Sequence, residues 1–220
     1  MIAALIVTAV LQHSTLLAPA PKNAVVLFDG KDTSAWVQGD SSPCKWNIVD
    51  GVLEVNTESD SIHTKQEFGD YHLHLEFWLP KMLDKTSQGR ANSGCYQHGR
   101  YEVQILDSYE NPTYKFGGVG AIYAQKDPDK NAVQPPETWN TYDIDFKAPR
   151  FDKDGKLTAQ PIITVFHNGI RIHNKVAIKN QYSDEAMKGQ PADKLKTGPI
   201  LLQNHGCKIR FRNIWIQPKK

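Results

Sequence analysis

The stretch IITVFHNGIRI, residues 162–172, decides the fold class of this chain. Two apolar runs, Ile162–Phe166 and Ile170–Ile172, flank Asn168-Gly169. An Asn-Gly pair tolerates the positive φ that a two-residue hairpin turn requires. The stretch therefore predicts two antiparallel strands joined by a tight turn.

Outward from this hairpin, similar signals recur along the chain. Asp50-Gly51 separates Trp46–Val49 from Val52–Val55, which predicts a second hairpin. The run Tyr71–Phe77 alternates with a period of two and predicts a half-buried strand. One face of that strand carries Leu73, Leu75 and Phe77, and the other carries His72, His74 and Glu76.

The C-terminal run predicts a strand with one irregularity. Ile209 and Phe211 alternate in one phase, whereas Ile214 and Ile216 alternate in the other. A bulge near Arg212-Asn213 must absorb the extra residue.

Little else in the chain has a helical pattern. Only Ser183–Lys188, with Ser183 as N-cap and Gly189 as the stop, predicts a short helix. No linker or tandem repeat follows Val25. We therefore expect a single all-β domain, a sandwich or jelly roll.

Composition excludes several classes of protein. The chain has 220 residues, 40% of them hydrophobic, which is enough for a real core and excludes a disordered or fibrous chain. A formal charge of +2 is too small to neutralise phosphates, so we expect no nucleic-acid partner. Cys44, Cys95 and Cys207 lack CxxC spacing, which argues against a disulfide scaffold or a zinc cluster and allows at most one bridge.

The N-terminus is typical of an export signal. The apolar run Ile2–Leu11 is followed by the small residues of Leu16–Ala20, so we expect a signal peptide over 1–20, a domain over 21–220, and a secreted or periplasmic protein. No Lys or Arg precedes the run, and a cut after Ala18 or Ala20 would leave a proline next. A misassigned start codon or a retained N-terminal anchor would explain both features, and we expect no other membrane contact.

The strand Arg100–Asp107 is the first candidate for chemistry. Tyr101, Val103 and Ile105 are expected to face the core, with Glu102 and Gln104 on the opposite face. Such a pair is often merely solvated. Polar residues are dense just upstream, however: Arg90, Asn92, Tyr96, Gln97 and His98. The two neighbouring strands could therefore line a groove suited to sugar hydroxyls.

Two further segments carry candidate residues. His205 in Leu202–Gly206 could exchange a proton near neutral pH, although a lone histidine is more often structural. Trp139 follows a proline-rich turn and could stack on a sugar, although it could equally anchor a core.

Other motifs point away from metal and phosphate chemistry. His72-x-His74-x-Glu76 has metal-ligand spacing, but any outward strand face shows the same alternation. Gly117–Gly120 lacks the Lys-Ser/Thr of a phosphate loop and is better interpreted as a glycine-rich loop beside the groove. No GxSxG elbow is present.

Several blocks, in order along the chain, resemble the bacterial 3-keto-disaccharide hydrolase domain family. They are Leu27–Asp32 with Trp36, Trp46 with Asp50–Leu53, Arg90–Tyr96, Tyr101–Asp107, Gly120–Tyr123, Trp139–Tyr142, Leu202–Gly206 and Phe211–Ile214. The resemblance implies a concanavalin A-like jelly roll of two curved antiparallel sheets. It also implies cleavage of glycosides that a separate sugar 3-dehydrogenase has oxidised at C3. We expect a carbohydrate substrate and no cofactor; a structural Ca²⁺ would suit the resembled fold, and no ligands are assigned to it.

The implied chemistry needs one base, one acid and donors for an enolate. The resemblance suggests Glu102 and His205 for the proton transfers, without deciding which is base and which is acid. Substrate binding would fall to the neighbouring polar and aromatic residues Arg90, Asn92, Gln104, Tyr123, Trp139 and Gln203.

The sequence departs from related patterns in three places. Glu102-x-Gln104-x-x-Asp107 stands where glucanases of similar fold carry Glu-x-Asp-x-x-Glu, which argues against a two-carboxylate mechanism. Asn204 replaces an Asp that would partner His205, and Cys95 replaces an aliphatic residue. The main rival function is a non-catalytic carbohydrate-binding module of the same fold, with a structural or adhesion β-sandwich as a third.

Overall fold

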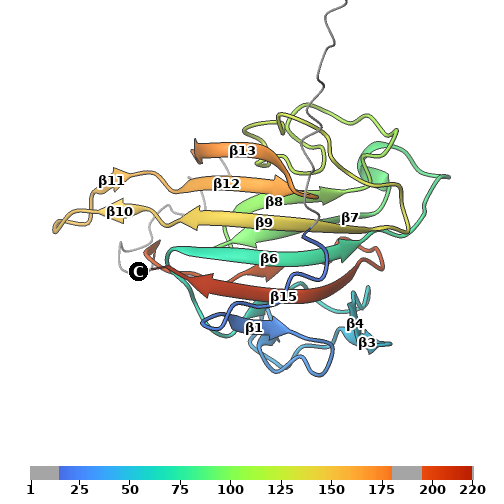
Figure 1. Cartoon of the computed structure of the whole chain (residues 1–220), viewed down its shortest axis with the longest axis horizontal. Helices are drawn as coiled ribbons and strands as arrows, with labels where there is room; N and C mark the ends of the chain where they lie inside the picture. Colours follow the sequence, from blue (N-terminus) through green and yellow to red (C-terminus); the bar gives the residue numbers. More distant parts are fainter. Residues whose placement is uncertain (1–14, 180–194, 220) are drawn as a thin grey trace, which may run out of the picture.

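The computed structural model describes residues 15–179 and 195–219, and its regular structure there is almost entirely antiparallel β. The larger sheet has eight strands (Figure 1). Its order is β13 (Ile170–Ala177), β12 (Ile162–His167), β9 (Trp139–Lys147), β6 (Tyr71–Trp78), β15 (Arg210–Pro218), β4 (Val52–Glu54) and β3 (Asn47–Val49), and β1 (Val25–Phe28) also pairs with β15.

The smaller sheet has five strands and lies behind the larger one in Figure 1. Its order is β2 (Trp36–Gln38), β5 (Ile62–Thr64), β14 (Leu201–Leu202), β7 (Asn92–Gln97) and β8 (Tyr101–Leu106). A protruding hairpin of β10 (Arg150–Phe151) and β11 (Leu157–Ala159) and a 3₁₀ turn, η1 (Ser87–Gly89), complete the elements. The fold is thus the expected all-β sandwich of two antiparallel sheets.

Both predicted hairpins are confirmed. Asp50 and Gly51 have φ of 52° and 73° between β3 and β4, and Asn168 and Gly169 have φ of 51° and 76° between β12 and β13. Two consecutive positive φ angles are typical of the type I′ turn, whose twist matches that of the flanking strands.

The predicted bulge in the last strand is also confirmed. The register of β15 against β6 shifts between Arg212 and Trp215, and Asn213 has a φ of 45°. The helix predicted over Ser183–Lys188 lies outside the described residues. Within the described ranges, no helix is long and apolar enough to cross a membrane.

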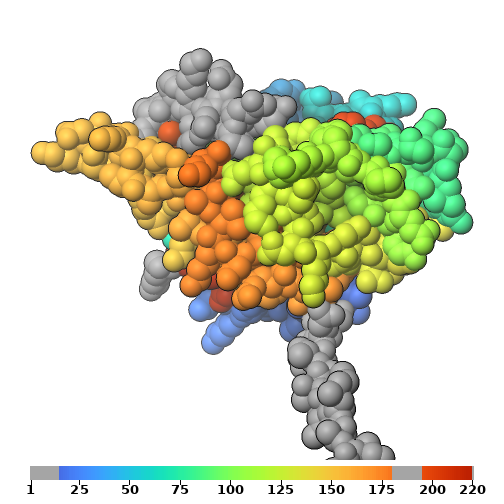
Figure 2. All heavy atoms as spheres, turned by 90° about the horizontal axis from the view of Figure 1, so that it is seen from above, coloured from blue at the N-terminus to red at the C-terminus, as the bar shows by residue number. Residues whose placement is uncertain are grey.

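The core fills the space between the sheets. Leu73, Leu75 and Phe77 from β6 face Val103 and Ile105 from β8, and all five are fully buried. We call the outward surface of the five-stranded sheet the groove face and that of the eight-stranded sheet the back face. A long segment, residues 107–138, borders β12 and β13 and forms a broad yellow-green surface in Figure 2.

Candidate functional site

The site is built on the groove face by neighbouring strands β7 and β8. Their register places Tyr96 opposite Glu102 and Gly94 opposite Gln104. Since alternate residues share a face, Glu102 and Gln104 project outward while Tyr101, Val103 and Ile105 are buried in the core. This is the orientation that the alternation predicts.

A cavity of about 180 Å³ opens at these side chains. Its lining is almost wholly polar or aromatic: Gln88, Asn92, Tyr96, Glu102, Gln104, Tyr114, Tyr123, Gln203 and His205. The structure therefore brings together six of the eight residues that we singled out from the sequence. Among the residues lining this cavity, Glu102 is the one carboxylic acid.

Glu102 has the electrostatics of a group that can exchange a proton near neutral pH. Burial of its carboxyl raises the pKa to about 7, although a hydrogen bond from Tyr96 acts in the opposite direction. Tyr96 in turn accepts a hydrogen bond of 3.2 Å from the Gln203 amide nitrogen. A carboxyl poised in this way meets the pKa requirement of a general base.

Gly94 makes room for this arrangement. A Cβ at this position would lie 2.4 Å from Glu102 Oε1 and 2.7 Å from the Tyr96 ring. Both distances are shorter than van der Waals contact allows. The Glu102 carboxyl and the Tyr96 ring therefore pack over a bare Cα. The glycine matters here because of the close approach of side chains, not because of its φ.

Three amide side chains form the floor beside Glu102. Gln88 Oε1 accepts hydrogen bonds from Asn92 Nδ2 at 3.1 Å and from Gln104 Nε2 at 3.3 Å. Gln104 Oε1 is buried and has no hydrogen-bond partner among the described residues. A buried acceptor without a partner is costly, so a ligand that donates a hydroxyl there would be bound favourably.

Aromatic hydroxyls and glycines close one side of the cavity. Tyr114 and Tyr123 share a hydrogen bond of 2.7 Å between their hydroxyl oxygens. The glycine-rich loop lies beside the groove as predicted, because the carbonyl of Gly117 accepts hydrogen bonds from Gln88 and Gln104. A Cβ on Gly117 would lie 2.2 Å from the Tyr114 ring.

His205 stands at the rim on the turn after β14. His205 is exposed. Hydrogen bonds of the Asn204 side chain hold the turn: Nδ2 donates to the carbonyls of Asn56 and Ser59, and Oδ1 accepts a hydrogen bond from the Gly206 N–H. Asn204 therefore fixes the position of the turn rather than orienting the imidazole. His205 can approach a substrate from the open side.

Two predicted binding residues lie outside this cavity. Arg90 pairs with the buried Asp107 at 3.4 Å and donates to the carbonyl of Tyr109, so it holds the segment after β8. Trp139 lies on the back face with the Arg212 guanidinium 4.0 Å from its ring centroid. Its strand β9 belongs to the other sheet, and strand alternation directs its side chain away from the groove.

The structure also adds lining residues that the sequence argument did not assign to binding. Tyr96 was recognised only as part of a polar stretch, and its alternation with Gly94 could have singled it out. Gln88 comes from the 3₁₀ turn η1 and Tyr114 from an irregular segment, and neither segment has a periodic signal. Among the described residues, no cluster of three or more His, Cys, Asp or Glu could hold a metal.

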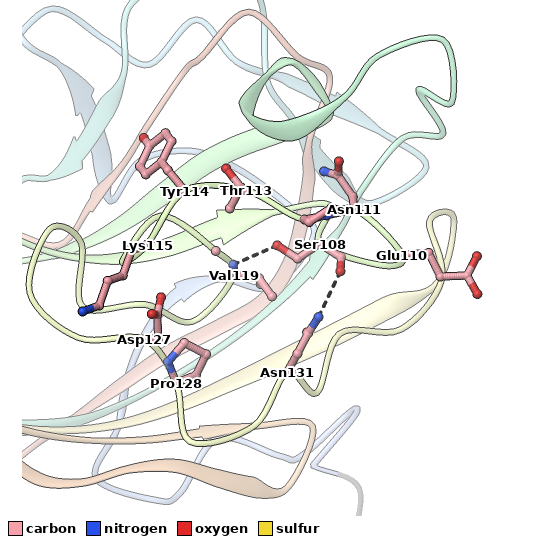
Figure 3. Close-up of a pocket in the computed structure, with 12 residues that line it drawn as sticks. Ser108, Glu110, Asn111, Thr113, Tyr114, Lys115, Val119, Asp127, Pro128 and Asn131 are labelled. Atoms are coloured by element: carbon pink, nitrogen blue, oxygen red, sulfur yellow. Dashed lines mark hydrogen bonds between the residues drawn. The ribbon is translucent and has the colours of Figure 1, made fainter.

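A second, larger cavity of about 500 Å³ adjoins the first (Figure 3). The two share Tyr114, and the larger one lies between residues 108–119 and residues 127–131. Two hydrogen bonds to Ser108 link the segments around this cavity. The Ser108 hydroxyl accepts one from the Val119 N–H, and the Ser108 carbonyl accepts one from Asn131 Nδ2. Figure 3 shows Glu110 pointing away from the cavity.

Comparisons with known proteins identify relatives of the chain. Residues 23–217 match the family model described as the 3-keto-alpha-glucoside-1,2-lyase-like domain. A crystal structure of a "putative glycosyl hydrolase" from Parabacteroides distasonis ATCC 8503 is 43% identical, with a TM-score of 0.81 over 91% of this chain and 85% of that one. A second structure with the same description and organism is 21% identical, with a TM-score of 0.64 over 90% and 94%. No curated protein matches the chain.

Proposed function

Since the chain belongs to the 3-keto-alpha-glucoside-1,2-lyase-like family of carbohydrate-acting enzymes, we propose that it is an exported enzyme that cleaves 3-keto-glycosides, with 3-keto-disaccharides as the substrate class. The observation that carries this proposal is the single carboxyl of the cavity, Glu102, set among amides and tyrosine hydroxyls. A C3 ketone acidifies the proton at C2. One base is then enough to start cleavage.

In this mechanism Glu102 removes the C2 proton and the ketone oxygen takes the negative charge as an enolate. The enolate then expels the group at C1, breaking the C1–O bond, and His205 protonates the departing oxygen. Addition of water across the new C1–C2 double bond gives net hydrolysis. The family description names a 1,2-lyase, which corresponds to the elimination step.

The assignment of base and acid follows from position. Glu102 is half-buried on the floor, where burial holds its pKa near 7, and Tyr96 hydrogen-bonds to it. His205 is exposed at the rim, where a leaving group would exit. Among the described residues that line the cavity, no second carboxyl accompanies Glu102 as it would in a retaining glycosidase, and Asp107 is buried against Arg90.

The floor amides and the two cavities would bind different parts of the substrate. Gln203 Nε2, which donates one hydrogen bond to Tyr96, is a nearby donor for the enolate oxygen, and the unpartnered Gln104 Oε1 would accept a hydroxyl of the keto sugar. The 180 Å³ cavity suits one sugar ring, and the 500 Å³ cavity past Tyr114 would hold the leaving sugar. A separate sugar 3-dehydrogenase would supply the ketone.

The test is to incubate the protein with a 3-keto-disaccharide and with its unoxidised parent in D₂O and to follow products by mass spectrometry. We expect cleavage of the keto form alone, with one deuterium gained at C2. Glu102→Gln should lose turnover and keep sugar binding, whereas Asp154→Asn, at an exposed carboxylate in the turn between β10 and β11, should behave as the parent. Saturable sugar binding without cleavage of either sugar would identify a binding module instead.

A further inference from the structure

The back face carries a second cluster of buried polar groups, unrelated to the groove. His74 and Glu76 point outward from β6, yet both are fully buried. Glu76 Oε2 accepts a hydrogen bond of 2.7 Å from Arg212 Nε, and His74 Nδ1 lies 2.7 Å from Asp143 Oδ1. The sequence alternation predicted a solvated face here, so something must cover it.

The cover is the chain's own segment Thr15–Ala18, which crosses β9, β6 and β15 in Figure 1. The Thr15 hydroxyl donates to Asp143 Oδ2 at 2.6 Å, and the Leu17 N–H donates to Glu76 Oε1. The Ala18 carbonyl accepts hydrogen bonds from Asn213 Nδ2 at 3.0 Å and Trp215 Nε1 at 3.2 Å. The cluster thus binds one side-chain hydroxyl, one main-chain N–H and one carbonyl of this segment.

The segment adopts a defined turn in this site. The Ala18 N–H donates to the Thr15 carbonyl at 3.0 Å, and Leu17 has a φ of 59°. A bulky residue in the left-handed region is strained and persists only where its surroundings fix it. The Leu17 side chain is 68% exposed, so the main-chain contact with Glu76, rather than packing of the leucine, holds this conformation.

The buried charges need the segment. A carboxylate withdrawn from water is stable only with hydrogen-bond donors around it. Glu76 receives hydrogen bonds from Arg212, Asn213 and the Leu17 N–H, and His74 Nε2 lies 3.6 Å from its Oε1. Removing Thr15–Ala18 would open Glu76, His74 and Asp143 to solvent.

We propose that the back-face cluster is a docking site for the N-terminal segment of this chain, and that Thr15–Ala18 stay on the exported protein. Any leader would then be cut before Thr15, rather than after Ala18 or Ala20. A cut after either alanine would leave a proline next, which already weakens those two positions.

A matched pair of variants at one exposed residue tests this proposal. Leu17→Pro removes the N–H that reaches Glu76 and cannot adopt a positive φ, whereas Leu17→Gly keeps the N–H and relieves the strain. We expect the exported full chain to have a mass that includes Thr15–Ala18. We expect Leu17→Pro to lower its Tm by about 4 °C or more, and Leu17→Gly to leave Tm equal or higher.

Three results would overturn the proposal. One is an exported protein whose mass begins at Pro19 or Pro21. Another is a Leu17→Pro protein with the parent's Tm, since the segment would then not be docked. The third is an equal loss of Tm in both variants, which would trace to the leucine side chain instead. Both readouts, the mass of the exported chain and its Tm, are taken without substrate, so the result does not depend on the proposed function.

Discussion

The substitution Gly94→Ala separates site geometry from folding. Gly94 lies on β7 with no positive φ, so alanine is acceptable to the backbone. Its Cβ, however, would stand 2.4 Å from Glu102 Oε1, and ordinary contact begins at 3.4 Å. The Glu102 carboxyl, the Tyr96 ring or both must therefore move by about 1 Å.

A displacement of this size has unequal effects on activity and stability. A misplacement of about 1 Å in a catalytic group can cost about 10²-fold in rate, which corresponds to about 2.7 kcal/mol of transition-state stabilisation. The clashing atoms are the ends of side chains, so the fold can relax by rotamer changes costing about 0.5–1.5 kcal/mol. We expect kcat/KM to fall about 100-fold while Tm falls by only a few degrees.

The assay is kcat/KM on a 3-keto-disaccharide together with Tm from thermal unfolding. Gly39→Ala is the matched control, because a Cβ at Gly39 meets nothing within 4 Å and its φ is not positive. Parental kcat/KM in Gly94→Ala would refute the placement of Glu102 and Tyr96 over Gly94. A collapse of Tm with no specific loss of activity would refute the claim that the clash is local to the site.

Further predictions follow from the titration of Glu102 and the burial of the cysteines. If Glu102 is the base, kcat/KM rises with pH through about 7, and Tyr96→Phe, which removes a hydrogen bond that lowers the pKa, moves the midpoint to higher pH. The pKa of Glu102 is raised from 4.5 to about 7 in the folded protein, so the stability that protonated Glu102 contributes is present below pH 4.5 and is lost as the pH rises through 7. The Tm of Glu102→Gln should therefore exceed that of the parent at pH 8 but not at pH 4. Iodoacetamide at pH 8 should label the half-buried Cys44 before Cys95, whose pKa burial raises to about 12, as peptide mapping would show.

The features that could be predicted from sequence are those fixed within a few residues. The Asp50-Gly51 and Asn168-Gly169 turns, the bulge near Asn213 and the outward direction of Glu102 all follow from local φ preferences or from period-two alternation. His205 was singled out because an imidazole can exchange a proton near neutral pH, and the structure places it at the cavity. Such signals need no knowledge of which strands pair.

The features that could not be predicted depend on pairing between distant strands. Trp139 does begin a strand, but only the register with β6 and the membership of β9 in the larger sheet place its ring on the back face. Arg90 is drawn to Asp107, a partner 17 residues away, across the fold of β7 and β8. Neither partner can be identified from the spacing of polar residues alone.

Two glutamates of this chain show why tertiary contacts, and not strand alternation, decide which carboxyl can react. Both Glu76 and Glu102 alternate with buried residues on a strand, and burial alone would raise both pKa values. Hydrogen bonds from Asn213, Arg212 and the Leu17 N–H, together with the nearby His74 ring, more than offset this at Glu76 and hold its pKa at about 2, so it stays ionised and holds no proton to exchange. At Glu102, burial dominates, the opposing hydrogen bond among the described residues comes from Tyr96, and the pKa stays near 7. The number of donors that the fold supplies therefore makes one glutamate a structural anion and leaves the other able to take a proton from a substrate.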